Sequence, residues 1–268
     1  MVRVGLVGCG TIGTRLAVAL HRTYAGVARL AALHDADPAH AERLRRRLTP
    51  RPAMLSLPAL IQRVDIIVEA ASAGAAPEVV RQALAAGRTV LVMSVGGLLQ
   101  DRTWQNLARR SRGKVCIPSG ALAGLDGIVA MALGRIHHAQ LTTRKPPTAL
   151  AGSPYVRRRR LALERLRRPT VIFEGTPQAV VRAFPQNTNV AAALTLAIGP
   201  RAVRPRVRVV ADPALSHNVH ELEVESDCGR IQCRIESRPS VNPKTSELAV
   251  RSAIVTLGRL FDHLVVGT

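Results

Sequence analysis

The sequence predicts an α/β protein with two sheets, a doubly wound parallel sheet followed by an open mixed or antiparallel sheet. Over residues 1–120, short β-branched runs alternate with helical patterns, which indicates a parallel sheet covered by helices on both faces. After residue 120 the expected strands alternate polar and apolar residues, which indicates a sheet with one exposed face. The 268 residues are 47% hydrophobic, enough for two modest domains with packed cores.

The first domain is expected from strands that each lead toward a helix. We assign residues 1–120 to it and expect the C-terminal segment 241–268 to complete it, with an amphipathic helix at 245–261. Strands are predicted at 3–8, 28–35, 64–72, 89–94 and 114–120, and helices at 11–23, 38–48 and 76–87.

The second domain, residues 121–240, is expected to combine strands with two helices. Thr176 is predicted to cap a helix over 176–184, with Pro177 at its first position. A second helix over 189–199 is predicted to end at a glycine. Strands are predicted at 139–147, 169–176, 206–213, 220–226 and 229–237.

The formal net charge of +20 invites a nucleic-acid interpretation. Only three of the 38 basic residues are lysine, however, and the basic residues are scattered except for a cluster at 157–169. Aromatic residues make up 2% of the chain, so stacking platforms for bases are scarce. We favour a solvated basic helix face for the cluster over a polyanion site, and we do not expect nucleic acid as a partner.

The sequence does not favour a membrane or metal site. No apolar run approaches the ~18 residues that span a bilayer. The N-terminus lacks the apolar core and cleavage site of a signal peptide, so a cytoplasmic protein is expected. The four cysteines form neither a CxxC pair nor a Cys/His zinc pattern, which favours small buried thiols.

A glycine-rich motif, Gly8-x-Gly10-x-x-Gly13, follows the first strand and opens the first helix. This is the context of a Rossmann-type dinucleotide-binding turn. Its three glycines allow a tight turn, approach of the backbone to a pyrophosphate and close helix packing. The backbone amides of Thr11 and Ile12 are expected to bind the phosphates, helped by the helix dipole.

Two further segments are expected to contact the cofactor. Asp35 follows the second strand, 22 residues after Gly13, and would accept hydrogen bonds from the adenosine ribose. A carboxylate there repels a 2′-phosphate, which favours NAD and leaves NADP as the alternative. Ala71 and Ser72 follow the next strand, where small side chains leave room for the nicotinamide half; a plain loop is the alternative interpretation.

The later motifs resemble those of the L-aspartate dehydrogenase family, and the resemblance covers nearly the whole chain. It implies NAD(P)-dependent oxidative deamination of L-aspartate to iminoaspartate, then to oxaloacetate and ammonia, or the reverse reductive amination. It also implies a homodimer and makes residues 121–240 the substrate and dimerisation domain. In some members the imine feeds pyridine nucleotide synthesis. The segments are PSGALAGLD (118–126), TTRKPP (142–147), FPQNTNVAAALTLA (184–197), ADPALSHNVHELEVES (211–226) and NPKTSELAVRSAI (242–254).

The resemblance also implies roles for three residues. His220, in the N-V-H-E run, would be catalytic, and Ala121 and Asn189 would line the cofactor site. For Asn189 an ordinary helix cap is the alternative. Strand phase supports His220 over His217, because His220 shares the apolar face of its strand with Leu222 and Val224, whereas His217 precedes the strand.

A histidine pKa of ~6.5 suits proton transfer during water addition to the imine and loss of ammonia. The two substrate carboxylates need donors, for which Arg144, Lys145 and Lys244 are candidates. Two other functions stay open at this point. One is an NAD(P)-dependent reductase of a different imine or oxo acid, and the other is a nucleotide-sensing protein that binds nucleic acid.

Overall fold

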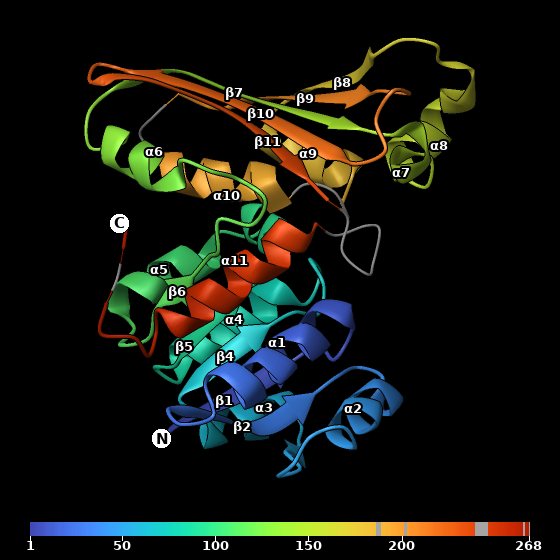
Figure 1. Cartoon of the computed structure of the whole chain (residues 1–268). Coiled ribbons are helices and arrows are strands. Elements are labelled where there is room, and N and C mark those ends of the chain that lie inside the picture. The colour runs from blue at the N-terminus through green and yellow to red at the C-terminus, as the bar shows by residue number, and fades with distance from the viewer. Residues whose placement is uncertain (186–188, 201–202, 239–245, 265, 268) are drawn as a thin grey trace. The chain divides into compact units, whose positions relative to one another are not determined.

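The computed structural model describes residues 1–185, 189–200, 203–238, 246–264 and 266–267. It divides the chain into two compact units, of which the first comprises Met1–Pro118 and Val250–Leu264 and the second Ser119–Ala249. Each unit has its own sheet (Figure 1) and its own hydrophobic core. Among the described residues, no helix has the length and apolar character needed to cross a membrane.

The first unit contains a parallel six-stranded sheet in the order β3-β2-β1-β4-β5-β6. The order reverses between β1 and β4, and in open α/β sheets ligands bind outside the carboxyl ends of the strands at such a point. The loops that follow β1 and β4 therefore lie at the expected ligand-binding edge. The strands are β1 (Val2–Val7), β2 (Ala28–His34), β3 (Ala53–Met54), β4 (Ile66–Glu69), β5 (Thr89–Val92) and β6 (Val115–Cys116).

Helices cover both faces of this sheet (Figure 1). On one face, Leu16 of α1 and Leu257 of α11 join a core with Leu6 of β1. On the other face, the position of Gly5 leaves space for Leu60 of α3, since a Cβ there would lie 2.5 Å from that side chain. The helical elements are α1 (Thr11–Thr23), α2 (Pro38–Arg45), α3 (Leu57–Arg63), α4 (Ala76–Ala85), η1 (Val95–Leu99), α5 (Thr103–Arg110) and α11 (Glu247–Gly258).

The second unit contains a mixed five-stranded sheet in the order β11-β10-β7-β9-β8. Only β7 and β9 pair in parallel, and the other three pairings are antiparallel. The strands are β7 (Ile136–Lys145), β8 (Thr170–Gly175), β9 (Arg206–Ala211), β10 (Asn218–Ser226) and β11 (Gly229–Ser237). The helical elements are α6 (Leu125–Met131), α7 (Pro147–Leu150), α8 (Pro154–Arg159), η2 (Leu163–Arg165), α9 (Pro177–Ala183) and α10 (Asn189–Ile198).

The two faces of the second sheet differ in chemistry. Helices α6, α9 and α10 lie on one face (Figure 1), where Leu222 and Val224 join the core. The opposite face carries ion pairs between neighbouring strands, among them Arg144 with Glu221 and Arg230 with Glu223. The predicted fold class, a doubly wound parallel sheet plus an open mixed sheet, is therefore confirmed.

Some local predictions are wrong. The strand predicted over 114–120 is reduced to the two residues of β6. The basic cluster at 157–169 is not one helix face, because α8 ends at Arg159 and Arg160 adopts a left-handed conformation with φ of 52°. Like charges three and four residues apart destabilise a helix, and Pro169 ends the segment. The sequence analysis also missed helices α3, α5 and α6.

Candidate functional site

The three motif glycines meet different steric demands. Gly8 has φ of +95°, and a Cβ there would lie 2.5 Å from the backbone of Ala70 in the loop after β4. A Cβ on Gly13 would lie 1.9 Å from the carbonyl oxygen of Gly8, so Gly13 allows helix α1 to pack on the turn itself. A Cβ on Gly10 would meet nothing within 4 Å. Gly10 thus leaves open space at a point where the protein's own packing does not require glycine.

Helix α1 starts directly after this open position. Gly10 is its N-cap, and the first hydrogen bond of the helix runs from the Thr14 amide to the Gly10 carbonyl. The amides of Thr11 and Ile12 precede that bond, so they belong to the helix-end donors that have no carbonyl partner within the helix. Thr11 is exposed and Ile12 is partly buried. The turn therefore presents amide donors and the positive end of a helix dipole.

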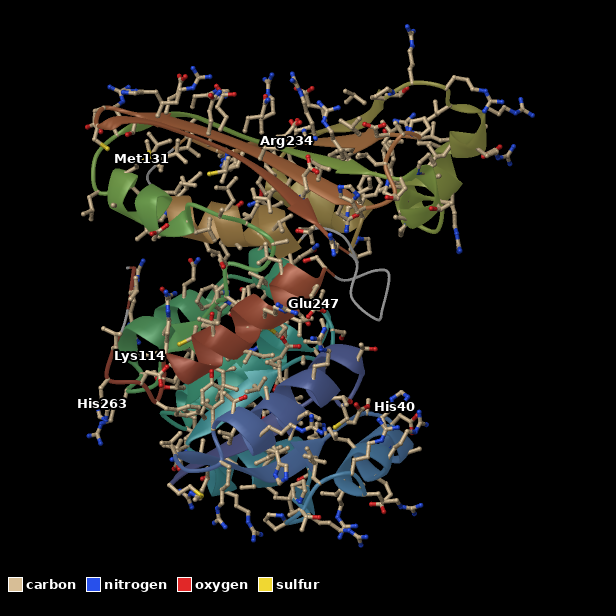
Figure 2. The ribbon with its side chains drawn as sticks, in the orientation of Figure 1. His40, Lys114, Met131, Arg234, Glu247 and His263 are labelled. Carbon is tan, nitrogen blue, oxygen red and sulfur yellow. The ribbon has the colours of Figure 1, made fainter. Side chains whose placement is uncertain are left out.

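Asp35 lies directly after β2, and the glycine turn holds its carboxylate. The Cys9 amide donates to Oδ2 at 2.6 Å, and the Asp37 amide donates to Oδ1 at 2.9 Å. His40, which projects from α2 (Figure 2), lies 3.8 Å from Oδ1. The carboxylate is therefore fixed beside the turn, at the position that contacts the adenosine ribose in dinucleotide-binding folds.

Ala71 and Ser72 are exposed in the loop after β4, and the buried carboxylate of Glu69 organises this loop. The Ala71 amide donates to Oε1 and the Ser94 amide donates to Oε2, each at 2.9 Å. Burial raises the pKa of Glu69, while these backbone donors act in the opposite direction. One side chain thus joins the loops that follow β4 and β5. The sequence analysis missed Glu69, although a carboxylate ending the apolar run IIVE needs buried donors and could have been noticed.

Replacing Glu69 by glutamine is expected to lower the free energy of unfolding by about 1–3 kcal/mol. One of the two amides then faces an NH2 group, and a buried donor without an acceptor costs about that much. Urea denaturation monitored by circular dichroism measures the change. Glu78→Gln is the matched control, because Glu78 is exposed on α4 and its contacts with Arg81 and Gln82 lie at the surface. Equal losses in both variants would contradict the role assigned to Glu69.

Ala121 and Asn189 both lie in the second unit. Ala121 is 3% exposed in the turn before α6, and Asn189 is exposed as the first residue of α10. Helices α6 and α10 pack against each other. The structure thus brings the segments that carry these two residues to one side of the second sheet. The prediction that Asn189 opens a helix is confirmed.

His220 is buried on the helix-covered face of the second sheet. It is 3% exposed, and Leu222 and Val224 on the same face of β10 are buried too, which confirms the predicted strand phase. Thr143 lies directly opposite on β7, with its Oγ1 3.1 Å from Nδ1 of His220. No described residue forms a hydrogen bond with Nε2. Thr143, which the sequence analysis did not single out, fixes the imidazole so that Nε2 is left for other chemistry.

Burial lowers the pKa of His220 to about 3, and the charge of Lys145 adds to the decrease. The imidazole is therefore neutral near pH 7 and a weaker base than the ordinary histidine that the sequence analysis assumed. His217 differs in every respect. It lies before β10, is partly exposed and contacts Glu236 with its Nε2 3.5 Å from Oε2. The two histidines thus occupy different environments, His220 buried in the sheet and His217 partly exposed beside a carboxylate.

The three candidate carboxylate donors are separated by the structure. Lys145 lies on the same face of β7 as Thr143 and is 3% exposed. Arg144 lies on the opposite face, where its Nε donates to both carboxylate oxygens of Glu221 at 3.0 Å. Lys244 lies outside the described residues. Among the described residues, no group of three or more His, Cys, Asp or Glu side chains could hold a metal ion.

Both halves of the chain match known protein families. Residues 126–260 match the family model "Aspartate dehydrogenase, C-terminal", and residues 8–117 match "Homoserine dehydrogenase, NAD binding domain". An L-aspartate dehydrogenase from Methanosarcina barkeri is 42% identical over 100% of both chains. The chain belongs to the L-aspartate dehydrogenase family. A relative from Bradyrhizobium diazoefficiens with the same name is 39% identical over 100% of this chain and 94% of its own.

Solved structures agree with this family. The aspartate dehydrogenase of Thermotoga maritima is 26% identical over 100% of both chains, with a TM-score of 0.75. A putative myo-inositol dehydrogenase of Sinorhizobium meliloti shares the fold at 14% identity and a TM-score of 0.53, over 97% of this chain and 88% of its own. The aspartate dehydrogenase structure thus matches this chain over its full length, across both units.

Proposed function

We propose that this protein is an NAD(P)-dependent L-aspartate dehydrogenase that interconverts L-aspartate with iminoaspartate, and thereby with oxaloacetate and ammonia. The observation that carries the proposal is the buried, neutral imidazole of His220, oriented by Thr143, in the part of the chain that matches the aspartate dehydrogenase C-terminal family. A buried histidine with one ring nitrogen fixed and the other unpartnered among the described residues is suited to proton transfer.

The first unit fits a pyridine dinucleotide. Gly10 leaves open space in front of the amides of Thr11 and Ile12, and the Asp35 carboxylate is fixed beside the same turn. We propose that these amides bind the pyrophosphate, that Asp35 binds the adenosine ribose, and that the loop at 71–72 receives the nicotinamide half. Ala121 and Asn189 of the second unit are proposed cofactor contacts on the strength of the family resemblance.

The reaction needs proton transfers from the protein, whereas the bound cofactor supplies the hydride acceptor for Cα of aspartate. His220 Nε2 takes a proton from the water that adds to the C=N bond of the imine. Hydride loss leaves this imine protonated (C=NH2+), so the addition gives a neutral carbinolamine, and His220 returns the proton to its nitrogen. As the carbon–nitrogen bond breaks, His220 takes the proton of the new hydroxyl group. The C=O bond of oxaloacetate then forms, neutral ammonia leaves, and His220 releases its proton to solvent. Thr143 holds Nδ1 throughout, which keeps Nε2 directed at the reacting atoms. In reductive amination the same group acts in the opposite order.

We further propose NAD as the preferred cofactor, because a fixed carboxylate at Asp35 repels a 2′-phosphate. A homodimer, which the family resemblance implies, and the cytoplasmic location expected in the sequence analysis complete the proposal. The solution mass from light scattering tests the dimer.

The function is tested by following NADH formation with L-aspartate, and NADH oxidation with oxaloacetate plus ammonia. We expect turnover in both directions and a kcat/KM for NAD at least about tenfold above that for NADP, since one repulsive charge contact is worth roughly 1.4 kcal/mol or more. Turnover with a different oxo acid and none with oxaloacetate would show that the substrate assignment is wrong. A higher kcat/KM with NADP would show that Asp35 does not set the cofactor preference.

A further inference from the structure

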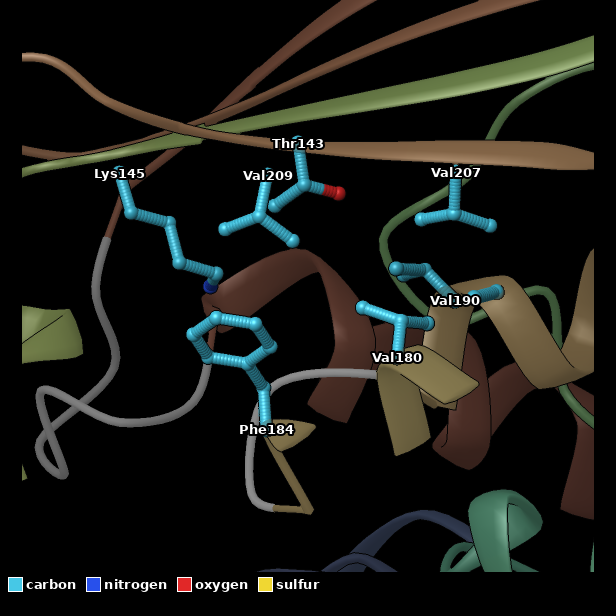
Figure 3. Close-up of a pocket in the computed structure, with 8 residues that line it drawn as sticks. Thr143, Lys145, Val180, Phe184, Val190, Val207 and Val209 are labelled. Carbon is cyan, nitrogen blue, oxygen red and sulfur yellow. The ribbon is translucent and has the colours of Figure 1, made fainter. Parts of the chain in front are cut away.

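Lys145 occupies an unusual position at the end of β7. Its side chain is 3% exposed and extends from the sheet toward the ring of Phe184 (Figure 3). It lines a pocket in which Thr143 supplies the other polar side chain. The other described residues that line it are apolar, namely Val180, Phe184, Val190, Ala191, Val207 and Val209.

The ammonium group of Lys145 has no anionic partner within the described part of the chain. No described residue forms a hydrogen bond or ion pair with it, and burial alone accounts for the decrease of its pKa to about 8. Burying a charge without a partner is strongly unfavourable. Natural folds therefore retain such a charge mainly where a bound ligand of opposite charge pairs with it. Near pH 7 the group is a cation facing an apolar pocket.

We propose that Lys145 binds one carboxylate of the dicarboxylate substrate, a role that rests on the dehydrogenase function proposed above. An ammonium and a carboxylate form a charge-assisted hydrogen bond, and apolar walls strengthen it by excluding water. Arg144, the neighbouring cation, is unsuited to this role. Its guanidinium already pairs with Glu221 on the opposite face of the sheet.

A carboxylate bound at Lys145 also changes the pKa of the neighbouring His220. The charge of Lys145 contributes to the low pKa of His220, after the larger effect of burial. A carboxylate paired with Lys145 cancels that contribution, so the pKa of His220 rises and its imidazole becomes a stronger base. Proton transfer by His220 is therefore more favourable when substrate is bound than when the site is empty, although burial still lowers its pKa. The binding cation and the acid/base group form one coupled pair.

Within the described ranges of the chain, few titratable groups surround Lys145. His220 faces it from β10, and Asp212 follows β9 with its amide bonded to the Lys145 carbonyl. The Asp212 carboxylate accepts a hydrogen bond from the Ala214 amide. Helices α9 and α10 and strand β9 contribute only apolar side chains to the pocket lining. Among the groups that the structure describes, Lys145 and His220 are therefore the ones whose titration a pH effect on anion binding at Lys145 would report.

Succinate, a dicarboxylate without an amino group, is the binding probe. Calorimetry with the NADH-bound protein is expected to give a Kd about 10- to 100-fold higher for Lys145→Met than for the wild type, because a hydrogen bond to a charged group is lost. Lys145→Arg keeps the cation and should recover part of the affinity. Arg144→Met is the matched control, one residue along the strand on the opposite face, and should bind succinate as the wild type does.

The pH dependence supplies a readout that a structural role would not change. Succinate stays doubly ionised above neutral pH, whereas Lys145 loses its proton as the pH rises through about 8. Wild-type Kd should therefore increase above pH 8, by up to about tenfold per unit. In Lys145→Arg the increase should move to higher pH, and in Lys145→Met it should disappear.

Substrate analogues identify which carboxylate is bound. L-2-Aminobutyrate has a methyl group where aspartate has its side-chain carboxylate. If Lys145 binds that carboxylate, Lys145→Met should raise KM for aspartate about 10- to 100-fold and leave KM for 2-aminobutyrate unchanged. If it binds the α-carboxylate, both KM values should rise together. Either result supports the proposal.

A Lys145→Met variant with wild-type melting temperature, NADH affinity and succinate affinity would overturn it. A fall in kcat with unchanged KM for aspartate would overturn it too, since it would assign Lys145 to the chemical step alone. If the variant fails to fold, the wild type alone can test the proposal. A wild-type Kd for succinate that does not change between pH 7 and pH 10 would overturn it. Should the wild type not oxidise aspartate while succinate binding still depends on Lys145, the proposed function fails and the carboxylate site stands.

Discussion

Replacing His220 by alanine is expected to lower kcat for NAD-dependent aspartate oxidation by about 10²- to 10⁴-fold, the usual contribution of a positioned acid/base group. The imidazole is buried and neutral, and Thr143 holds its Nδ1 at 3.1 Å, so water cannot replace it in the same geometry. Affinity for NADH should change less than about threefold, because the proposed pyrophosphate and ribose contacts lie in the first unit. Steady-state kinetics and NADH fluorescence titration measure the two quantities.

His217→Ala is the matched control for this variant. His217 lies three residues earlier, is partly exposed and pairs with Glu236 at the surface, so its removal should leave kcat within about twofold. Wild-type kcat in His220→Ala would refute the proposed acid/base role, even though the fold would be unaffected. A large loss in both variants would point to a shared structural effect in the segment before β10 instead.

Replacing Gly13 by alanine is expected to destabilise the first unit by about 3 kcal/mol and to abolish cofactor binding. The added Cβ would lie 1.9 Å from the Gly8 carbonyl oxygen, a backbone atom that cannot move without shifting the turn. Overpacking of this kind costs about 1–3 kcal/mol even where side chains can adjust. Thermal and urea denaturation measure the stability, and NADH titration measures binding.

Gly10→Ala separates ligand contact from folding. A Cβ at Gly10 meets no atom within 4 Å, so the expected loss of stability is about 1 kcal/mol or less, mainly from the poorer helix cap. If the pyrophosphate approaches the backbone here, the same methyl group should weaken NADH binding roughly tenfold or more. Unchanged NADH affinity in Gly10→Ala would place the cofactor elsewhere, and unchanged stability in Gly13→Ala would contradict the close contact with Gly8.

The fold class could be predicted from the sequence because it depends on patterns among residues that are close together in the chain. The alternation of β-branched runs with helical patterns gives the parallel sheet, and the alternating polarity of HELEVES (220–226) gives a half-covered sheet. The same phase placed His220 on the apolar face and His217 before the strand, as the structure has them. The basic cluster could not be assigned this way, because charge repulsion and a left-handed Arg160 interrupt the helix there.

The sequence by itself determined the sheet types, the glycine turn and the inward position of His220, since each depends on neighbours along the chain. Only the tertiary structure decided how the buried polar groups are paired. It joined Thr143 to His220 across two strands, gave Glu69 two amides from separate loops, and paired Arg144 with Glu221 across β7 and β10. Such pairings bring residues that are distant in sequence together in the protein interior. A buried polar group or charge without a partner is costly there, so the pairs must form. No pattern of neighbouring residues in the sequence shows which groups will pair.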